Sequence, residues 1–197
     1  MPYDLFLALV VFAIVTSLSP GPNNLMLMAS GANFGFRRTI PHMLGIGIGF
    51  VVMVLMVGLG LAQVFDAYPV SYTILNVASL MYMLYLAWKI ANATAPKQAD
   101  GQGRQLTFLQ AAGFQWVNPK AWAMALTSIS LYAPDRTVGS MLMVALIFGA
   151  VNLPCVSSWT VLGQQMRRVL TNPSRLRAFN WTMAMLLVAS LVPVLWA

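Results

Sequence analysis

The stretch LSPGPNNLM, residues 18–26, places two prolines and a glycine inside a run of apolar residues. Proline lacks an amide hydrogen, and the residue before a proline avoids the helical region. We therefore expect an unwound turn at Pro20, Gly21 and Pro22, and a new helix that begins at Pro22 or Asn23. The carbonyls before this break and the amides after it then need partners, because unpaired polar groups in lipid are costly.

The chain around this stretch is too apolar for a soluble domain. Its 197 residues are 59% hydrophobic and 8% charged, whereas soluble domains carry about 25% charged residues. Six apolar segments reach or approach the roughly 17–25 residues of a spanning helix: Leu5–Ala29, Met43–Val64, Tyr72–Trp88, Leu106–Leu131, Val138–Leu162 and Ala178–Trp196. The sequence therefore predicts an all-α integral membrane protein with six transmembrane helices in one domain, residues 1–197, surrounded by the lipid bilayer.

The net charge of +7 belongs to the connections between these segments rather than to a nucleic-acid surface. The first, third and fifth connections hold nine of the eleven Lys and Arg residues: Arg37, Arg38, Lys89, Lys97, Arg104, Arg167, Arg168, Arg175 and Arg177. Basic connections remain in the cytoplasm. We therefore expect a multi-pass protein of the bacterial cytoplasmic (inner) membrane, with both termini on the non-cytoplasmic side and no nucleic-acid partner.

A second break lies at the corresponding place in the second half of the chain. The stretch LQAAGFQWVNPKAWAMALTS, residues 109–128, is interrupted at Asn118 and Pro119. A linker at about 92–105 separates residues 1–91 from residues 106–197, and each half holds three apolar segments. An odd number of segments gives the halves opposite topology, so they are expected to be inverted three-helix repeats. Matching broken helices in such repeats indicate a transporter's binding site; proline kinks repaired by neighbouring side chains are the alternative.

Several motifs resemble the LysE/RhtB family of amino-acid exporters. SPGPNN, GFRR, GIGIGF, YLAWKI and WVNPKAW occur in this order and at compatible spacing over essentially the whole chain. The double asparagine and the AWKI segment are most similar to the cysteine and O-acetylserine exporters of that family. The resemblance implies a six-helix inner-membrane exporter driven by an ion gradient. Many relatives have an aspartate where this chain has Asn23, which leaves the route of a coupling proton open.

The candidate substrate-binding residues lie at the two breaks and in the fifth segment. Lys120 follows the second break inside a spanning segment, where it is expected to bind a substrate carboxylate; snorkelling to the surface is the alternative. The asparagines offer donors and acceptors to a substrate, or they cap the half-helices. In the fifth segment, Asn152 and Trp159 share a helix face. They either line the substrate cavity or pack against neighbouring helices. The full set is Pro20, Gly21, Pro22, Asn23, Asn24, Gln115, Asn118, Pro119, Lys120, Asn152 and Trp159.

The remaining reactive side chains restrict the chemistry. The acids Asp4, Asp66, Asp100 and Asp135 all lie at segment ends or in connections, so a substrate ammonium must bind freed carbonyls or asparagines. One histidine, His42, and one cysteine are too few ligands for a dedicated metal site, so we expect neither a bound metal nor a cofactor. The GxxxG pair within GIGIGF, residues 45–50, predicts close helix packing.

These observations predict a secondary transporter that exports a small neutral amino acid or a close derivative by alternating access, coupled to the proton-motive force. An exporter of metal ions or other small solutes with the same architecture, and a non-transporting membrane subunit, remain alternatives. A membrane enzyme is disfavoured because the sequence offers no nucleophile–base pair, metal cluster or acid pair near the membrane surface. The sequence leaves open whether the chain forms a homo-oligomer.

Overall fold

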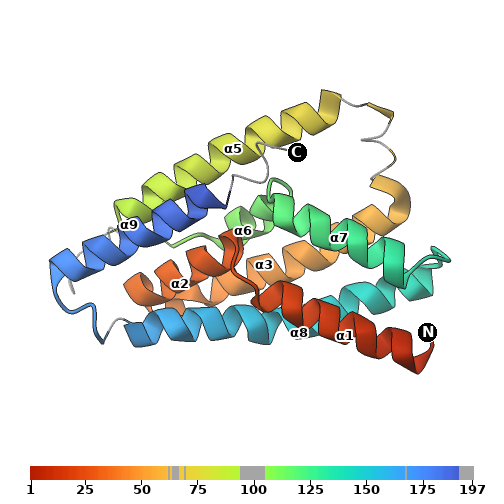
Figure 1. Cartoon of the computed structure of the whole chain (residues 1–197), viewed down its shortest axis with the longest axis horizontal. Coiled ribbons are helices and arrows are strands. Elements are labelled where there is room, and N and C mark those ends of the chain that lie inside the picture. Colours follow the sequence, from red (N-terminus) through yellow and green to blue (C-terminus); the bar gives the residue numbers. More distant parts are fainter. Residues whose placement is uncertain (62, 64–66, 69, 94–104, 167, 191–197) are drawn as a thin grey trace.

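In the computed structural model, every described residue with regular structure is helical, and the description covers all residues except 62, 64–66, 69, 94–104, 167 and 191–197. The helices form an elongated bundle (Figure 1). They are α1 (Tyr3–Leu18), α2 (Pro22–Phe34), α3 (Phe36–Met56), η1 (Val57–Leu61), α5 (Val70–Ala91), α6 (Phe108–Gln115), α7 (Pro119–Tyr132), α8 (Val138–Met166) and α9 (Pro173–Ala189). The all-α fold predicted from the sequence is confirmed.

Both predicted breaks are present. The first helix ends at Leu18, the next begins at Pro22, and the two are bent by 55° relative to each other. The second break separates α6 from α7, which begins at Pro119. Asn118 caps α7, because its Oδ1 accepts a hydrogen bond from the backbone N–H of Lys120 at 3.2 Å. Proline at the first position of α2 and of α7 follows the preference of that position for a residue without an N–H.

The predicted segment boundaries were wrong at two connections. The residues expected to connect the first two segments are helical, since α2 continues to Phe34 and α3 begins at Phe36. Gly35 alone makes the turn, with a φ of 80° that favours glycine. Similarly, α9 begins at Pro173 rather than at residue 178. The first turns of α3 and α9 are polar and basic. An apolar segment in the sequence is therefore shorter than the helix that contains it. Most of the linker 92–105, and the predicted ends at Val64 and Trp196, lie outside the described residues.

The described helices include three that are long and apolar enough to cross a membrane: Phe36–Leu61, Thr73–Ala91 and Val138–Met166. The bent pair of α1 and α2 makes a fourth if it is one span. The two other predicted segments correspond to α6 with α7 and to α9, which has 17 described residues. The six-helix count therefore remains a prediction.

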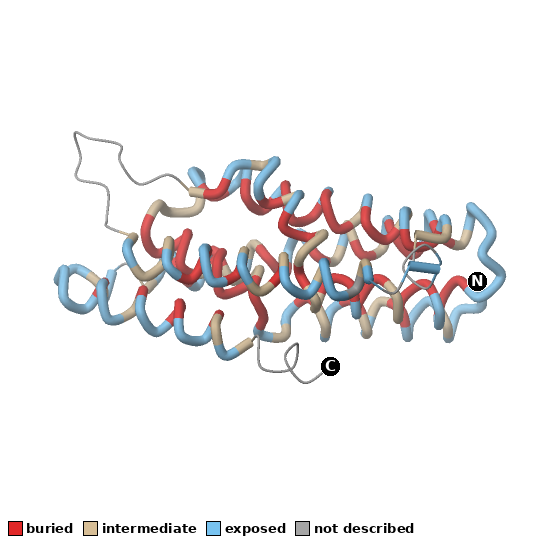
Figure 2. Tube along the Cα trace, turned by 90° about the horizontal axis from the view of Figure 1, so that it is seen from above, coloured by how far each residue is buried: buried red, intermediate tan, exposed pale blue. Residues whose placement is uncertain are grey.

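Close helix contacts hold the bundle together. The main pairs are α2 with α8, α3 with α6 and α8, α1 with α8, and α5 with α9. A Cβ at Gly49 would lie 2.7 Å from Ala112 Cα, and one at Gly45 would lie 2.4 Å from the Phe108 carbonyl oxygen, so the predicted packing role of the GxxxG pair is confirmed. Figure 2 shows buried residues along the inner faces of the helices and exposed ones outside. Many exposed side chains are large and apolar, such as Val70 and Met81, as lipid-facing positions are.

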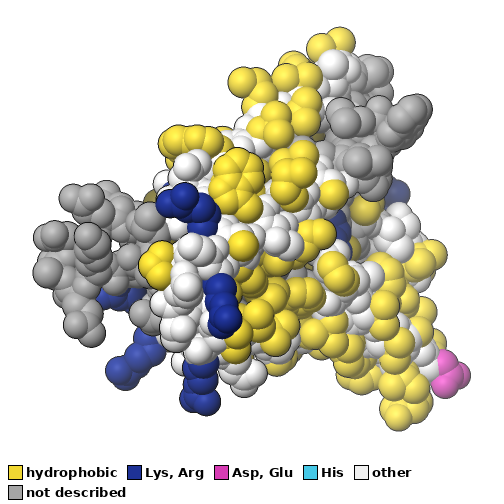
Figure 3. All heavy atoms as spheres, turned by 60° about the vertical axis from the view of Figure 1, so that its left-hand side comes forward, with side chains coloured by type: hydrophobic (Ala, Val, Ile, Leu, Met, Phe, Trp, Pro, Cys, Tyr) yellow, Lys and Arg dark blue, Asp and Glu magenta, His cyan; other side chains and the backbone are white. Residues whose placement is uncertain are grey.

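The two ends of the bundle differ in charge. Figure 1 shows the α2–α3 and α8–α9 connections at one end, and the start of α1 with the α7–α8 connection at the other. Arg37, Arg38 and Arg168 line one open groove at the first end, and Figure 3 shows several basic side chains on one side of the molecule and an acidic one at the opposite side. At the second end, a hydrogen bond from Ser140 Oγ, at 2.6 Å, helps to hold the pKa of Asp135 below its ordinary value. We call these ends the basic end and the opposite end.

Candidate functional site

The two breaks are joined by the side chain of Lys120. Its Nζ donates hydrogen bonds to Ser19 O at 2.7 Å, to Ser19 Oγ at 2.8 Å and to Pro20 O at 3.3 Å. Gly21 makes room for this side chain, because a Cβ there would lie 2.7 Å from Lys120 Cδ. The ammonium therefore lies at the carbonyl end of α1, where the helix dipole favours a positive charge. In this conformation the ammonium is bound at the first break.

A pair of amides makes a second link between the breaks. Asn23 Nδ2 donates to Gln115 Oε1 at 2.9 Å, and Gln115 Nε2 donates back to Asn23 Oδ1 at 3.3 Å. Gln115 is completely buried, and its Nε2 also donates to Ala111 O at 2.8 Å. These two residues are separated by 92 positions in the chain. The start of α2 is thereby fixed against the end of α6.

The carbonyls freed by the first break are paired with side chains. Asn24 Nδ2 donates to Ser17 O at 2.8 Å and to Ser19 O at 2.9 Å. Trp159 Nε1 donates to Leu18 O at 3.2 Å. Together with Lys120, these side chains provide donors to all four carbonyls from residue 17 to residue 20. The carbonyls that the first break frees are thus satisfied within the protein, as a low-dielectric interior requires.

Other polar groups of the site have no partner. No side chain caps the N-terminus of α2 among the described residues. The Asn152 side chain is 6% exposed, and its Nδ2 donates to Ser17 Oγ at 3.3 Å, but its Oδ1 has no partner within the described structure. Buried side-chain oxygens are usually paired. The site therefore contains the uncapped N-terminus of α2 and one amide oxygen without a partner.

The space between these groups is small. A cavity of about 20 Å³ is lined by the first-break residues Gly21, Asn23 and Asn24, by Lys120 and by Asn152, among others. This volume is sufficient for about one water molecule. The structure is therefore a conformation in which the breaks are closed against each other.

The structure brings all eleven predicted residues together around the two breaks. Of the alternatives, capping is confirmed for Asn118, whereas Asn23 and Asn24 contact the opposite break and the end of α1. Sequence reasoning missed the side chains of Ser17 and Ser19, which accept from Asn152 and Lys120. Both serines precede the PGP motif within three residues. This closeness to the break is the feature of the sequence that indicates a role at the site. The substrate-binding role of the whole set remains a prediction.

Interrupted helices that meet inside an apolar helical bundle are typical of secondary membrane transporters. The comparison with known proteins identifies the family. The chain belongs to the family described as LysE type translocator, which residues 14–192 match. The resemblance found in the sequence is thereby confirmed, and so is the expectation that the chain is a transporter and not an enzyme.

The chain is similar along its length to proteins that are named as efflux proteins. It is 30% identical over 194 residues to the "Cysteine/O-acetylserine efflux protein" of Escherichia coli (strain K12), and the match covers 94% of each chain. The protein of the same name from Shigella flexneri is equally similar, and that of Escherichia coli O139:H28 is 29% identical over 194 residues, again covering 94% of each chain. No solved structure matches the chain.

Proposed function

We propose that the chain exports a small neutral amino acid, of the size and polarity of cysteine or O-acetylserine, across the bacterial inner membrane by alternating access. One observation carries this proposal. The ammonium of Lys120, from the second break, is hydrogen-bonded to the carbonyl end of the first break beside the unpaired Oδ1 of Asn152. The names of the similar efflux proteins support the choice of substrate class.

The site has a partner for each charge of an amino acid. The substrate carboxylate binds Lys120 and the uncapped start of α2, since cationic groups and helix N-termini both favour anions. The substrate ammonium binds Asn152 Oδ1 and the carbonyls that Lys120 leaves. The two ammonium groups thus exchange places on the end of α1. This exchange removes the need for a carboxylate in the middle of the membrane, where the sequence provides none.

Substrate entry requires the breaks to separate, because the present cavity of about 20 Å³ is smaller than any amino acid. The contacts of the bundle support an inverted repeat that makes such movement symmetric. The half-helices before the breaks are α1 and α6, so the pairing of α3 with α6 corresponds to that of α8 with α1, and α3–α8 and α5–α9 join corresponding segments of the two halves. Residues 1–91 and 106–197 are the two repeats in this proposal. Rocking of one repeat against the other opens the site to each side in turn.

The orientation and the energy source complete the proposal. The basic end faces the cytoplasm by the positive-inside rule, so both termini lie outside. Coupling to the proton-motive force supplies the driving force, because a neutral zwitterion moves no net charge by itself. A metal-ion exporter lacks support from the site: the described residues contain no group of three or more His, Cys, Asp or Glu side chains. A non-transporting subunit would require neither break.

Efflux from preloaded liposomes tests this function. The purified protein is reconstituted, and the liposomes are loaded with labelled L-cysteine, O-acetyl-L-serine, L-serine or L-lysine. We expect efflux of the neutral amino acids, acceleration by an imposed proton gradient, and little efflux of L-lysine. A Lys120→Met variant that reconstitutes equally well serves as the control and should lose efflux. Retention of every amino acid by the unmodified protein, with or without a gradient, would contradict the proposal.

A further inference from the structure

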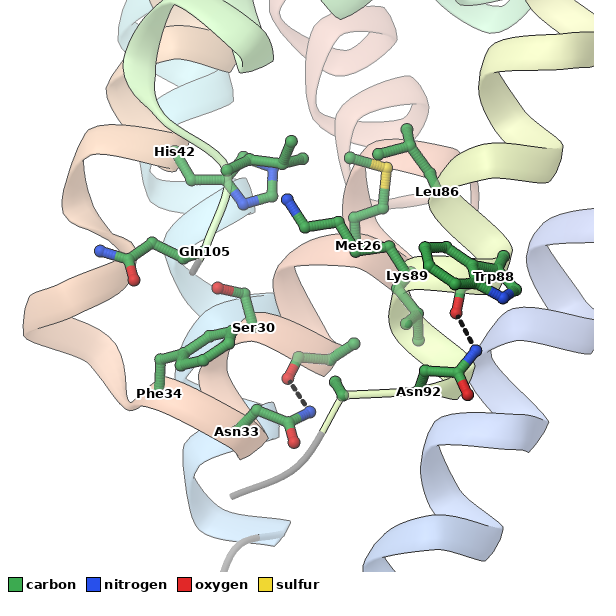
Figure 4. A pocket seen from close by; sticks show the side chains of 14 residues that line it. Met26, Ser30, Asn33, Phe34, His42, Leu86, Trp88, Lys89, Asn92 and Gln105 are labelled. Atoms are coloured by element: carbon green, nitrogen blue, oxygen red, sulfur yellow. Dashed lines mark hydrogen bonds between the residues drawn. The ribbon is translucent and has the colours of Figure 1, made fainter. Parts of the chain in front are cut away.

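A second cavity, of about 250 Å³, lies between α2, α3 and the end of α5, near the basic end and away from the breaks (Figure 4). Its walls are largely apolar and include Met26, Leu86 and Leu106. Its polar lining residues are Ser30, Asn33, His42, Lys89, Asn92 and Gln105. Pockets for small ligands occupy about 300–1,000 Å³, so this cavity lies just below that range and fits only a small ligand.

His42 is the most unusual group in this cavity. The side chain is 1% exposed, and neither ring nitrogen has a hydrogen-bond partner within the described structure. Figure 4 shows the Lys89 side chain extending across the cavity toward the His42 ring. Lys89 makes no hydrogen bond or ion pair with any residue that the structure describes. Buried polar groups are nearly always paired, so this pair of groups is incomplete without a ligand or water.

The neighbouring polar side chains have partners in the protein. Ser30 Oγ and Thr39 Oγ1 share a hydrogen bond of 2.9 Å. Asn33 Nδ2 donates to Ala29 O and to Asn180 Oδ1, both at 2.8 Å. Asn92 Nδ2 donates to the Trp88 carbonyl at 2.8 Å. The Gln105 side chain extends away from Lys89 and His42 in Figure 4, so the groups left to receive a ligand are the ammonium of Lys89 and one N–H of a neutral His42 ring.

We propose that this cavity binds the carboxylate of a small organic acid between Lys89 and His42. A carboxylate has two oxygens, which match the two free donors. A phosphate would bring more oxygens and more charge into largely apolar walls, and a cation would be repelled by Lys89. The carboxylate belongs either to an amino acid or to an organic acid without an ammonium group. This site uses none of the break residues and goes beyond the proposed function.

Nuclear magnetic resonance of His42 tests the proposal directly. His42 is the single histidine of the chain, so labelled histidine gives one set of imidazole signals in nanodiscs. The protein is titrated separately with sodium acetate, L-serine, L-serinamide and inorganic phosphate. We expect a saturable shift of the His42 signals with acetate, with L-serine or with both, and none with serinamide or phosphate. A tighter response to L-serine assigns the site to amino acids, and a response to acetate alone assigns it to other organic acids.

Variants separate this cavity from the breaks. Lys89→Gln should weaken the affinity for the responding carboxylate on the order of tenfold or more, because it removes a charged hydrogen bond. Lys89→Arg retains the charge and should retain part of the affinity, which also controls for folding. Lys120→Met changes only the break and should leave the titration unaltered. This measurement needs no transport, so the proposal stands or fails independently of the efflux assay.

Four results would overturn the proposal. The first is the absence of saturation with both acetate and L-serine, and the second is an equal response to L-serinamide. The third is an unchanged affinity in Lys89→Gln, and the fourth is a lost response in Lys120→Met, since either places the ligand elsewhere.

Discussion

Replacing Lys120 with methionine removes the charge that joins the two breaks while it keeps a similar side-chain length. The variant loses the three hydrogen bonds to Ser19 and Pro20, at 2.7, 2.8 and 3.3 Å. A hydrogen bond to a charged group contributes about 1.5–3 kcal/mol. The interaction of a charged group with a helix terminus contributes roughly 0.3–2 kcal/mol. If Lys120 binds the substrate carboxylate, binding should weaken on the order of ten- to a hundredfold.

The assay compares an acid with its amide. Equilibrium binding of L-serine and of L-serinamide is measured for the unmodified protein and the variant in the same detergent. We expect Lys120→Met to weaken L-serine binding far more than L-serinamide binding, because only L-serine has a carboxylate. Lys120→Arg should rescue L-serine binding in part, since the planar guanidinium needs a different geometry.

Asn24→Ala is the matched control for damage to the break. It removes two hydrogen bonds to the same carbonyl segment, to Ser17 O and Ser19 O, but no charge. We expect this variant to weaken acid and amide binding by similar factors. Equal weakening of both ligands by Lys120→Met as well would refute the carboxylate assignment and leave Lys120 a structural link. No change for either ligand would exclude Lys120 from the site.

Three further perturbations test the breaks, the packing and the topology. Alanine at positions 20, 21 and 22 favours a continuous helix and places a Cβ 2.7 Å from Lys120 Cδ, so the protein should insert but lose efflux from liposomes; normal efflux would mean a tolerated kink. Gly163→Ala places a Cβ 2.0 Å from Met28 O, between α8 and α2. This variant should lower the free energy of unfolding by about 1–3 kcal/mol, measured by thermal denaturation. A Cβ at Gly139 in the same helix would meet nothing within 4 Å, so Gly139→Ala should not lower the free energy of unfolding. An equal loss of stability in both variants would contradict the packing argument. Reporters fused after Arg38 and Pro173 should indicate the cytoplasm, and one fused after Arg136 the opposite side; a cytoplasmic signal at Arg136 would contradict the orientation.

The breaks were predictable because their cause is local. Proline removes an amide hydrogen and restricts the residue before it, so Pro20, Pro22 and Pro119 determine where helices end and begin. The boundaries near residues 30–42 were not predictable from the same cues. Arg37, Arg38 and Pro41 are typical of a connection, yet all three lie in α3, because a helix can extend beyond its apolar segment into polar surroundings.

The pairings at the site were not predictable, because they depend on tertiary structure. Lys120 and Ser19 are separated by 101 positions, and Asn23 and Gln115 by 92. The sequence identified the chemical types but not which donor meets which acceptor. In the sequence, His42 is a lone potential metal ligand and Lys89 is a charge in a basic connection. Only the tertiary structure places both in the lining of one cavity.

In the proposed function, the position of Lys120 also determines which charges the site accepts. Its ammonium already occupies the carbonyl end of α1, so a cationic substrate would place a second positive charge close to it. Two like charges 4 Å apart repel by about 4 kcal/mol at an effective dielectric constant of 20. A zwitterion avoids this cost, because its carboxylate pairs with the Lys120 ammonium that its own ammonium displaces. The same repulsion acts on a metal ion, for which the described residues offer no cluster of acidic, histidine or cysteine ligands. The geometry therefore favours a neutral amino acid over a basic amino acid or a metal ion.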